Sequence, residues 1–213
     1  MSAARYVPAA GRFALRLYDP VLRLTMREGR WRGAVAALAA DGSSSIAEVG
    51  AGTGAQSLLL ASSARQGAQV VAVDGDPSAL AVARAKPGAE RVRWVRGLAD
   101  ALPVESGWAD AVVMTLLLHH LDGGGKRAAL AEAARVLRPG GRLVVADWGP
   151  PRGLLPSLGF RALTAIDGAA GTADHAAGRV PSFIAQAGFP DPRRRMRIGT
   201  VWGTLELLTA ERR

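Results

Sequence analysis

An acidic residue and three glycines at alternate positions form the first group in this chain whose spacing is suited to chemistry. They are Glu48, Gly50, Gly52 and Gly54, in the segment I-A-E-V-G-A-G-T-G-A-Q. Glycine lets a backbone turn sharply and approach a ligand closely, because no Cβ stands in the way. A second acid, Asp74, follows Gly54 by 20 residues. An acid at that distance accepts hydrogen bonds from ribose hydroxyls, so the spacing predicts a site for a nucleotide-containing cofactor.

The elements that must position these residues are two strands and two helices. The apolar residues before Gly50 predict a strand, residues 56–66 a helix, and residues 69–73 a buried strand rich in β-branched side chains. Pro77 then marks the first turn of another helix. Strand, tight turn and helix form a loop of the Rossmann kind, in which free N–H groups at the helix start face the ligand.

Two kinds of cofactor fit such a loop. Gly50, Gly52 and Ala55 satisfy the G-x-G-x-x-G/A pattern of nicotinamide-dependent oxidoreductases. Glu48 and the additional Gly54 give acid-x-Gly-x-Gly-x-Gly, which resembles motif I of class I S-adenosylmethionine (SAM)-dependent methyltransferases. In that family the glycines pack under the methionine part of SAM, and the acid helps to place the cationic cofactor. The later block L-R-P-G-G also resembles the methyltransferases and argues against an oxidoreductase.

A third segment resembles the stretch that binds adenine in this family. Residues 97–104 (G-L-A-D-A-L-P-V) are similar to G-D-A-x-x-L-P-F, whose acid hydrogen-bonds the adenine amino group. Leu98 stands where that acid is expected, so either Asp100 replaces it or backbone and apolar contact with Leu98 and Ala99 hold the adenine. The resemblance implies these cofactor-binding residues: Glu48, Gly50, Ala51, Gly52, Gly54, Gln56, Asp74, Gly75, Leu98, Ala99, Asp100 and Thr115.

Two histidines after the fourth predicted strand are candidate catalytic residues. That strand covers residues 110–115 and continues into L-L-L-H-H-L-D, which is similar to a segment of the family. Ligands of open α/β sheets bind beyond the carboxyl ends of the strands, so His119 and His120 are expected at the mouth of the site. One could act as a general base, since an unperturbed imidazole has a pKa near neutrality. In the alternative, one histidine packs under the cofactor and the other caps the next helix. That helix is expected over residues 126–137, after a flexible turn at residues 123–125.

The acceptor side of the site is expected after the fifth strand, predicted at residues 142–146. The resemblance implies that residues 150–174, with a helix over residues 158–167, shape the pocket for the methyl acceptor. The candidate substrate-binding residues are Asp147, Trp148, Asp174 and His175.

The resemblance implies an α/β fold, a Rossmann-like three-layer sandwich. The expected sheet has seven mostly parallel strands in the order 3-2-1-4-5-7-6, with strand seven antiparallel. We expect residues 41–213 to form a single compact methyltransferase domain. Residues 1–40 are expected to form an N-terminal helical cap packed on it, with helices over residues 14–28 and 31–40.

The composition narrows the classes of function. The chain has 213 residues, no cysteine and three histidines, so we expect neither a disulfide nor a metal site. The net charge is +9, yet Lys86 and Lys126 are the only lysines, so the arginine excess also fits a genome-wide codon bias. No apolar run reaches the roughly 20 residues of a membrane span, and the N-terminus lacks the apolar core of a signal peptide. We therefore predict a cytoplasmic protein.

The N-terminal arginines allow two interpretations. Such a basic, amphipathic helix could contact an anionic membrane peripherally or cap a lipid-like substrate. Alternatively, it is an ordinary helix packed on the core, with a solvated arginine face. The arginines concerned are Arg12, Arg16, Arg23, Arg27 and Arg30.

These features predict a SAM-dependent methyltransferase that acts on a small-molecule or lipid-like acceptor and leaves S-adenosylhomocysteine. The N-P-P-Y tetrad of nucleic-acid amino methyltransferases is absent, and Met114 to Leu117 stand in its place. The sequence therefore argues against nucleic acid as the partner. Two alternatives are kept: a SAM-binding protein without catalytic activity, which Leu98 favours, and a nucleic-acid methyltransferase that uses the basic surface. The oligomeric state is left open.

Overall fold

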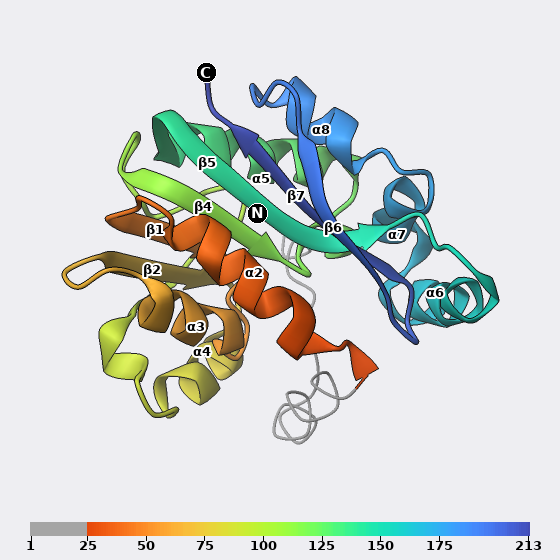
Figure 1. Cartoon of the computed structure of the whole chain (residues 1–213), viewed down its shortest axis with the longest axis horizontal. Helices are drawn as coiled ribbons and strands as arrows, with labels where there is room; N and C mark the ends of the chain where they lie inside the picture. The colour runs from red at the N-terminus through yellow and green to blue at the C-terminus, as the bar shows by residue number, and fades with distance from the viewer. Residues whose placement is uncertain (1–24) are drawn as a thin grey trace, which may run out of the picture.

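The strands assemble into one seven-stranded sheet with helices on both faces (Figure 1). The computed structural model describes residues 25–213. The strand order is β3-β2-β1-β4-β5-β7-β6, with β7 antiparallel to both of its neighbours and the other pairs parallel. The predicted fold class, strand order and antiparallel seventh strand are confirmed. The strands are β1 (Ser45–Val49), β2 (Gln69–Asp74), β3 (Arg93–Arg96), β4 (Ala109–Thr115), β5 (Leu137–Gly149), β6 (Arg193–Gly199) and β7 (Thr204–Glu211).

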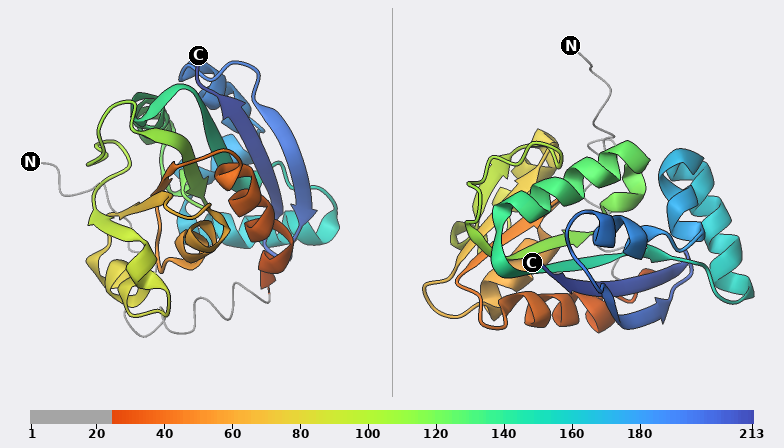
Figure 2. Two further views of the ribbon diagram at one scale, coloured as in Figure 1. Left: turned by 60° about the vertical axis from the view of Figure 1, so that its left-hand side comes forward. Right: turned by 90° about the horizontal axis from the view of Figure 1, so that it is seen from above.

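Two apolar cores arise from the alternation of side chains along the strands. Ile46 and Val70 belong to the core under α2 and α3, whereas their neighbours Ala47 and Val71 belong to the core under α5 and α8. Burial on both faces explains why these strands are almost continuously apolar. The right panel of Figure 2 shows α5 and α2 on opposite faces of the sheet. The helices are α2 (Glu28–Ala40), α3 (Ala55–Ser63), α4 (Pro77–Arg84), α5 (Gly123–Val136), α6 (Leu154–Asp167), α7 (Ala169–Ala176) and α8 (Val180–Gln186), with single turns η1 (Ala89–Arg91) and η2 (Leu118–His120).

The N-terminal helix of the described chain packs directly on the sheet. Helix α2 begins at Glu28, three residues before the predicted start, and ends at Ala40 as predicted. The chain leaves it through Gly42, which lies in the left-handed region. Its Trp31 is fully buried in the core. The predicted helix over residues 14–28 falls almost entirely outside the described residues, as do Arg12, Arg16 and Arg23. The division of the chain into an N-terminal cap (residues 1–40) and a methyltransferase domain (residues 41–213) stays a prediction.

The flexible turn predicted at residues 123–125 is wrong, because these glycines form the first turn of α5. The side chain of Asp122 accepts a hydrogen bond from the Gly125 N–H at 2.7 Å and caps the helix. A capping bond of this kind stabilises a helix start by about 1 kcal/mol, which offsets the poor helix propensity of one glycine.

Strand β5 is longer than predicted. It begins at Leu137, and its register jumps from the pair Ala109–Leu137 to the pair Ala111–Arg142. The block R-P-G-G therefore lies in a bulge inside the strand, where Pro139 need not donate a ladder hydrogen bond. Helix α7 was not predicted at all. Within residues 25–213, no helix combines the length and the apolarity needed to cross a bilayer.

Candidate active site

The glycine loop joins β1 to α3 at the carboxyl edge of the sheet. Gly50, Gly52 and Gly54 all have positive φ, at 76°, 53° and 82°. A Cβ on Gly50 would lie 2.8 Å from Cδ1 of Leu117, and one on Gly54 would lie 2.5 Å from Cη2 of Trp94. A Cβ on Gly52 would meet no atom within 4 Å. Internal packing therefore requires two of the glycines, whereas Gly52 borders open space through which a ligand can approach the backbone.

Asp74 lies at the end of β2 and holds this loop in place. Its Oδ2 accepts a hydrogen bond from the Gly52 N–H at 2.6 Å, and its Oδ1 accepts one from the Asp76 N–H at 2.8 Å. Burial raises the pKa of Asp74 in spite of these bonds. Each carboxylate oxygen has a second acceptor site. The side chain can therefore still accept from ribose hydroxyls, as the sequence predicts.

Glu48 is fully buried in β1 and connects three elements of the site. Its carboxylate accepts hydrogen bonds from the hydroxyls of Ser57 on α3 and of Thr115 at the end of β4. Burial raises the pKa of Glu48 to about 7, although the Ser57 hydroxyl acts in the opposite direction. A carboxyl group with this pKa is partly protonated at neutral pH, and a nearby cation would favour its charged form. Its contact with the cationic cofactor stays a prediction.

The other predicted cofactor residues differ in their surroundings. Gln56 is buried; its Nε2 donates to the carbonyl oxygen of Arg32 at 3.2 Å, while its Oε1 has no partner within residues 25–213. Leu98 is 39% exposed and bridges to Ala101, so its apolar side chain is open to solvent. Ala51 is buried, whereas Gly75, Ala99 and Asp100 are half-buried.

This edge of the sheet fits a nucleotide-containing cofactor. The ends of β1, β2 and β4 bring Gly52, Asp74 and Thr115 to the same edge, and the start of α3 directs free N–H groups there. The open backbone of Gly52 and the remaining acceptor sites of Asp74 give such a ligand both room and partners. Binding of SAM by the glycine loop and Asp74 stays a prediction.

A buried polar cluster follows β4 and β5 at the same edge. Oδ1 of Asp147 accepts hydrogen bonds from Nδ1 of His119 at 2.8 Å and from the Trp148 N–H at 2.7 Å, and Oδ2 accepts one from the Leu118 N–H at 2.7 Å. Burial alone would raise the pKa of Asp147, but His119 and then His175 hold it well below its usual range. A carboxylate can only accept, so Nδ1 of His119 carries a proton.

His120 lies against His119, with the ring centroids 4.0 Å apart. Burial, and then the neighbouring His119, lower the pKa of His120 to about 4. With this pKa, His120 is uncharged at neutral pH. A catalytic role for either histidine stays a prediction.

Trp148 and His175 are buried instead of lining an open cleft. The Trp148 ring is 4% exposed and lies edge-on to His119 and to Phe160, at centroid distances of 6.2 and 6.4 Å. Nδ1 of His175 donates to the Trp148 carbonyl oxygen at 2.7 Å. Nε2 of His175 and Nε1 of Trp148 have no partner within the described chain. Burial lowers the pKa of His175.

Lys126 is a buried residue that the sequence analysis did not single out. Its Nζ donates to the carbonyl oxygens of Leu121 at 2.6 Å and Gly171 at 2.7 Å, and pairs with Asp174 at 3.2 Å. Asp174 also pairs with Arg179 at 2.6 Å. These bonds join α7 to α5 and give Asp174 a structural task; its contact with substrate stays a prediction.

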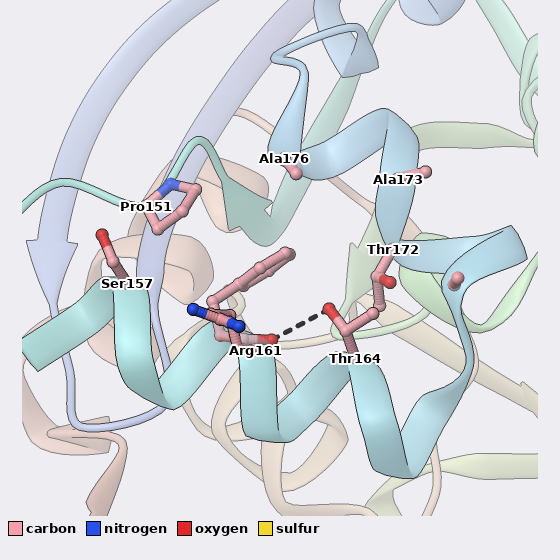
Figure 3. A pocket seen from close by; sticks show the side chains of 9 residues that line it. Pro151, Ser157, Arg161, Thr164, Thr172, Ala173 and Ala176 are labelled. Carbon is pink, nitrogen blue, oxygen red and sulfur yellow. Dashed lines mark hydrogen bonds between the residues drawn. The ribbon is translucent and has the colours of Figure 1, made fainter.

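An apolar pocket opens between α6 and α7, in the segment assigned to the acceptor. Its volume is about 530 Å³, within the roughly 300–1,000 Å³ of small-molecule sites. In Figure 3, Arg161 and Thr164 of α6 lie across from Thr172 and Ala176 of α7. The pocket is lined by Pro151, Ser157, Phe160, Arg161, Thr164, Ala169, Thr172, Ala173 and Ala176.

A row of aromatic rings connects this pocket to the polar cluster. Phe160 lines the pocket and contacts Trp148, and Trp148 contacts His119. Phe160 was not among the predicted site residues. Helix α7 was not predicted, because its alanine- and glycine-rich segment carries little helical periodicity. Asp174 and His175 lie on α7 outside the lining of the pocket. Within residues 25–213, no group of histidine and acidic side chains is arranged to hold a metal ion.

A protein-family comparison identifies the central part of the chain. The model of a methyltransferase-domain family matches residues 47–145, which include the glycine loop, Asp74 and the histidine pair. A search of curated proteins gives no match to this sequence.

Solved structures with the same fold include named methyltransferases. The YcgJ protein from Bacillus subtilis has a TM-score of 0.66 and 16% identity, over 86% of this chain and 99% of that chain. Human N-acetylserotonin methyltransferase in complex with SAM has a TM-score of 0.66 and 18% identity, and the match covers 97% of this chain and 60% of that chain. A third structure is phosphoethanolamine N-methyltransferase 2 of Haemonchus contortus in complex with phosphomonomethylethanolamine and S-adenosylhomocysteine. It has a TM-score of 0.65 and 18% identity, and the match covers 85% of this chain and 52% of that chain. These identities show a shared fold. The matched domain and the strand order are those of class I, Rossmann-like SAM-dependent methyltransferases.

Proposed function

We propose that the protein transfers a methyl group to a small-molecule or lipid-like acceptor whose apolar part occupies the pocket between α6 and α7. The pocket itself carries this proposal. It has a volume of about 530 Å³ and an apolar wall that includes Phe160. It also follows the carboxyl end of β5, the side of an α/β sheet on which ligands bind.

The residues of the chain would act mainly by alignment and exclusion of water. SAM, when bound, supplies an electrophilic methyl group on its sulfonium. Gly52 and Asp74 would orient the cofactor, and the nearly fully buried Trp148 and Phe160 would exclude water from the inner end of the pocket. Asp147 fixes the ring of His119 through Nδ1. His119 would then be placed to receive a proton from an alcohol or amine acceptor.

Two of the similar structures support a small acceptor. One is named for N-acetylserotonin, and the other holds phosphomonomethylethanolamine. Their low identity to this chain gives no reason to choose either molecule, so the proposal names the class of acceptor only.

The four arginines of β6 give only weak support for nucleic acid as a binding partner. All four have partners inside the protein, so a phosphate would have to compete with existing bonds. The partners are Asp191 for Arg193, Glu206 for Arg194 and Arg197, and the Thr209 hydroxyl for Arg195. Peripheral contact with an anionic membrane through the N-terminal arginines remains part of the proposal. Of these, Arg27 donates to the carbonyl oxygen of Gly199 at 3.3 Å, and Arg30 is exposed.

The test is transfer of label from SAM carrying a labelled methyl group. The protein is incubated with this SAM and an extract of the source cells, and label is counted in lipid, small-molecule, RNA and protein fractions. Label in the lipid or small-molecule fraction supports the proposal. Label in RNA supports the nucleic-acid alternative, and SAM binding without label in any fraction supports the non-catalytic alternative.

A pair of variants connects the labelled product to the pocket. Ala176→Phe places a ring in the pocket, whereas Ala170→Phe alters an exposed alanine of the same helix that does not line it. Transfer should fall at least about tenfold in the first variant, because the ring occupies acceptor volume, and should be retained in the second. Equal activity of both variants would place the acceptor elsewhere.

A further inference from the structure

The outer surface of α6 carries an apolar patch. Leu154, Leu155 and Leu158 are 79%, 62% and 54% exposed, and the spacing i, i+1, i+4 puts them on one side of the helix. Val201, in the loop between β6 and β7, is 44% exposed. We call these four residues the α6 face. Such contiguous exposed side chains usually mark an interaction surface.

Helix α6 packs closely against the rest of the protein. A Cβ on Gly159 would lie 1.8 Å from the carbonyl oxygen of Val201, so α6 lies directly against the loop that carries Val201. One residue further on, Phe160 is buried against Trp148 and anchors the inner side of the helix. The leucines therefore cannot turn inward without breaking this close contact. Helix α6 itself lies at one end of the molecule (Figure 1).

The charged residues in the two segments that carry this face are all arginines. Arg152 and Arg161 are exposed at the start and on the side of α6. No acidic residue occurs from Pro150 to Ala165, or from Pro192 to Thr204. Exposed leucines flanked by Arg152 and Arg161 match a surface with anionic head groups above an apolar interior.

The face is also continuous with the pocket. Arg161 belongs both to the exposed side of α6 and to the lining of the pocket, together with Ser157 and Thr164 (Figure 3). The pocket is therefore reached from the same side of α6 that carries Arg161.

We propose that the α6 face docks on an anionic lipid surface, with the three leucines inserted and Arg152 and Arg161 at the level of the head groups. The use of this docking for acceptor delivery rests on the proposed function; the docking itself does not. A second copy of the chain is disfavoured as the occupant, since a two-fold contact through this face would bring arginines together.

The test is co-sedimentation of the full chain, without SAM, with vesicles of phosphatidylcholine alone or with added phosphatidylglycerol. We expect binding to the anionic vesicles only, weakened by salt. Replacing Leu154, Leu155 and Leu158 together by serine should lower binding at least about tenfold, whereas Leu59→Ser on α3, with 37% exposure, should leave it unchanged. The double variant Arg152→Gln and Arg161→Gln should weaken binding to anionic vesicles, and Arg93→Gln on β3 should not. Thermal melts of each variant show that it is folded.

Three results would overturn the proposal. One is absence of vesicle binding by the wild-type chain, and another is equal binding by the triple-serine variant, which would assign binding to a different surface. The third is a wild-type dimer in sedimentation velocity that becomes a monomer in the triple-serine variant. Methyl transfer to an acceptor added without vesicles is measured separately. If methyl transfer persists but the protein does not bind vesicles, only the docking is refuted. If the protein binds vesicles but transfers no methyl group, only the proposed function is refuted.

Discussion

Oδ1 of Asp147 and Nδ1 of His119 lie 2.8 Å apart, although 28 positions separate the two residues in the chain. The same carboxylate also accepts the backbone N–H groups of Leu118 and Trp148. This side chain therefore fixes the end of β5, the turn η2 and one imidazole ring at once. It lies at the carboxyl end of β5, at the same edge of the sheet as the glycine loop.

Asp147→Asn should therefore affect both stability and catalysis. The amide loses the charge that holds the His119 ring and presents a donor to groups that already donate, so we expect a loss of about 2–4 kcal/mol in the free energy of unfolding. If His119 receives the acceptor proton, kcat should fall more than KM changes. Denaturant titration and steady-state kinetics measure the two effects. Asp122→Asn is the matched control, because asparagine caps a helix as well as aspartate does. An Asp147→Asn protein as stable as the control would contradict the role described for this carboxylate.

Asp74→Ala tests the cofactor end of the site. If the carboxylate accepts from ribose hydroxyls, the variant should lose about 1–3 kcal/mol of SAM binding, or roughly 5- to 150-fold in Kd. Asp41→Ala, at the C-terminal end of α2 where the acid is 77% exposed, should bind SAM normally. Calorimetric titration measures both affinities. Unchanged affinity of the Asp74 variant would remove this residue from the ribose site.

Substitutions of two glycines in the loop should distinguish effects on packing from effects on SAM binding. Gly54→Ala places a methyl group against Trp94 in a left-handed conformation, so we expect about 2–4 kcal/mol of destabilisation. Gly52→Ala incurs only the conformational cost, about 1–2 kcal/mol, but its methyl group enters the open space of the cofactor. Its SAM affinity should fall much more than its stability does. Thermal denaturation with and without SAM distinguishes the two variants, and a Gly52→Ala protein with normal affinity would show that SAM does not approach this backbone.

Leu98→Asp tests the departure from the adenine motif. If a contact to the adenine amino group is missing, the new carboxylate should tighten SAM binding by about 1 kcal/mol, roughly fivefold. Leu59→Asp introduces the same charge at a comparably exposed leucine on α3 and should have no effect. Absence of a gain at residue 98 would mean that Asp100 or the backbone already holds the adenine.

Glu48 should make stability depend on pH in a defined window. Its pKa is about 7 in the folded protein, against an ordinary value of 4.5, so the folded state retains a proton that the unfolded chain releases. The stabilisation from this proton is complete below pH 4.5 and is lost as the pH rises through about 7. The neutral Glu48→Gln variant should therefore gain stability relative to wild type as the pH rises, by up to about 3 kcal/mol. Denaturant titrations at pH 4, 6 and 8 measure this difference. A difference that does not change with pH would mean that Glu48 has an ordinary pKa.

Much of the fold was predictable because its signals are local. Apolar runs of strand length, the glycine loop and L-R-P-G-G each depend on neighbouring residues, so the strand order followed from the resemblance that they carry. The errors arose where local signals conflict with tertiary context. Three glycines do not suggest a helix start, yet Asp122 caps one there.

By itself, the sequence determined the class of protein, the cofactor loop and the position of Asp74, because the spacing of these residues is a property of the chain. Only the tertiary structure decided which of the candidate polar groups are buried and what they contact. Lys126 reaches Gly171 across 45 positions, and burial beside His119 lowers the pKa of His120 to about 4. The pocket between α6 and α7 and the exposed leucines beside it likewise depend on how distant segments pack. Burial and electrostatic environment arise through space, and a linear pattern does not contain them.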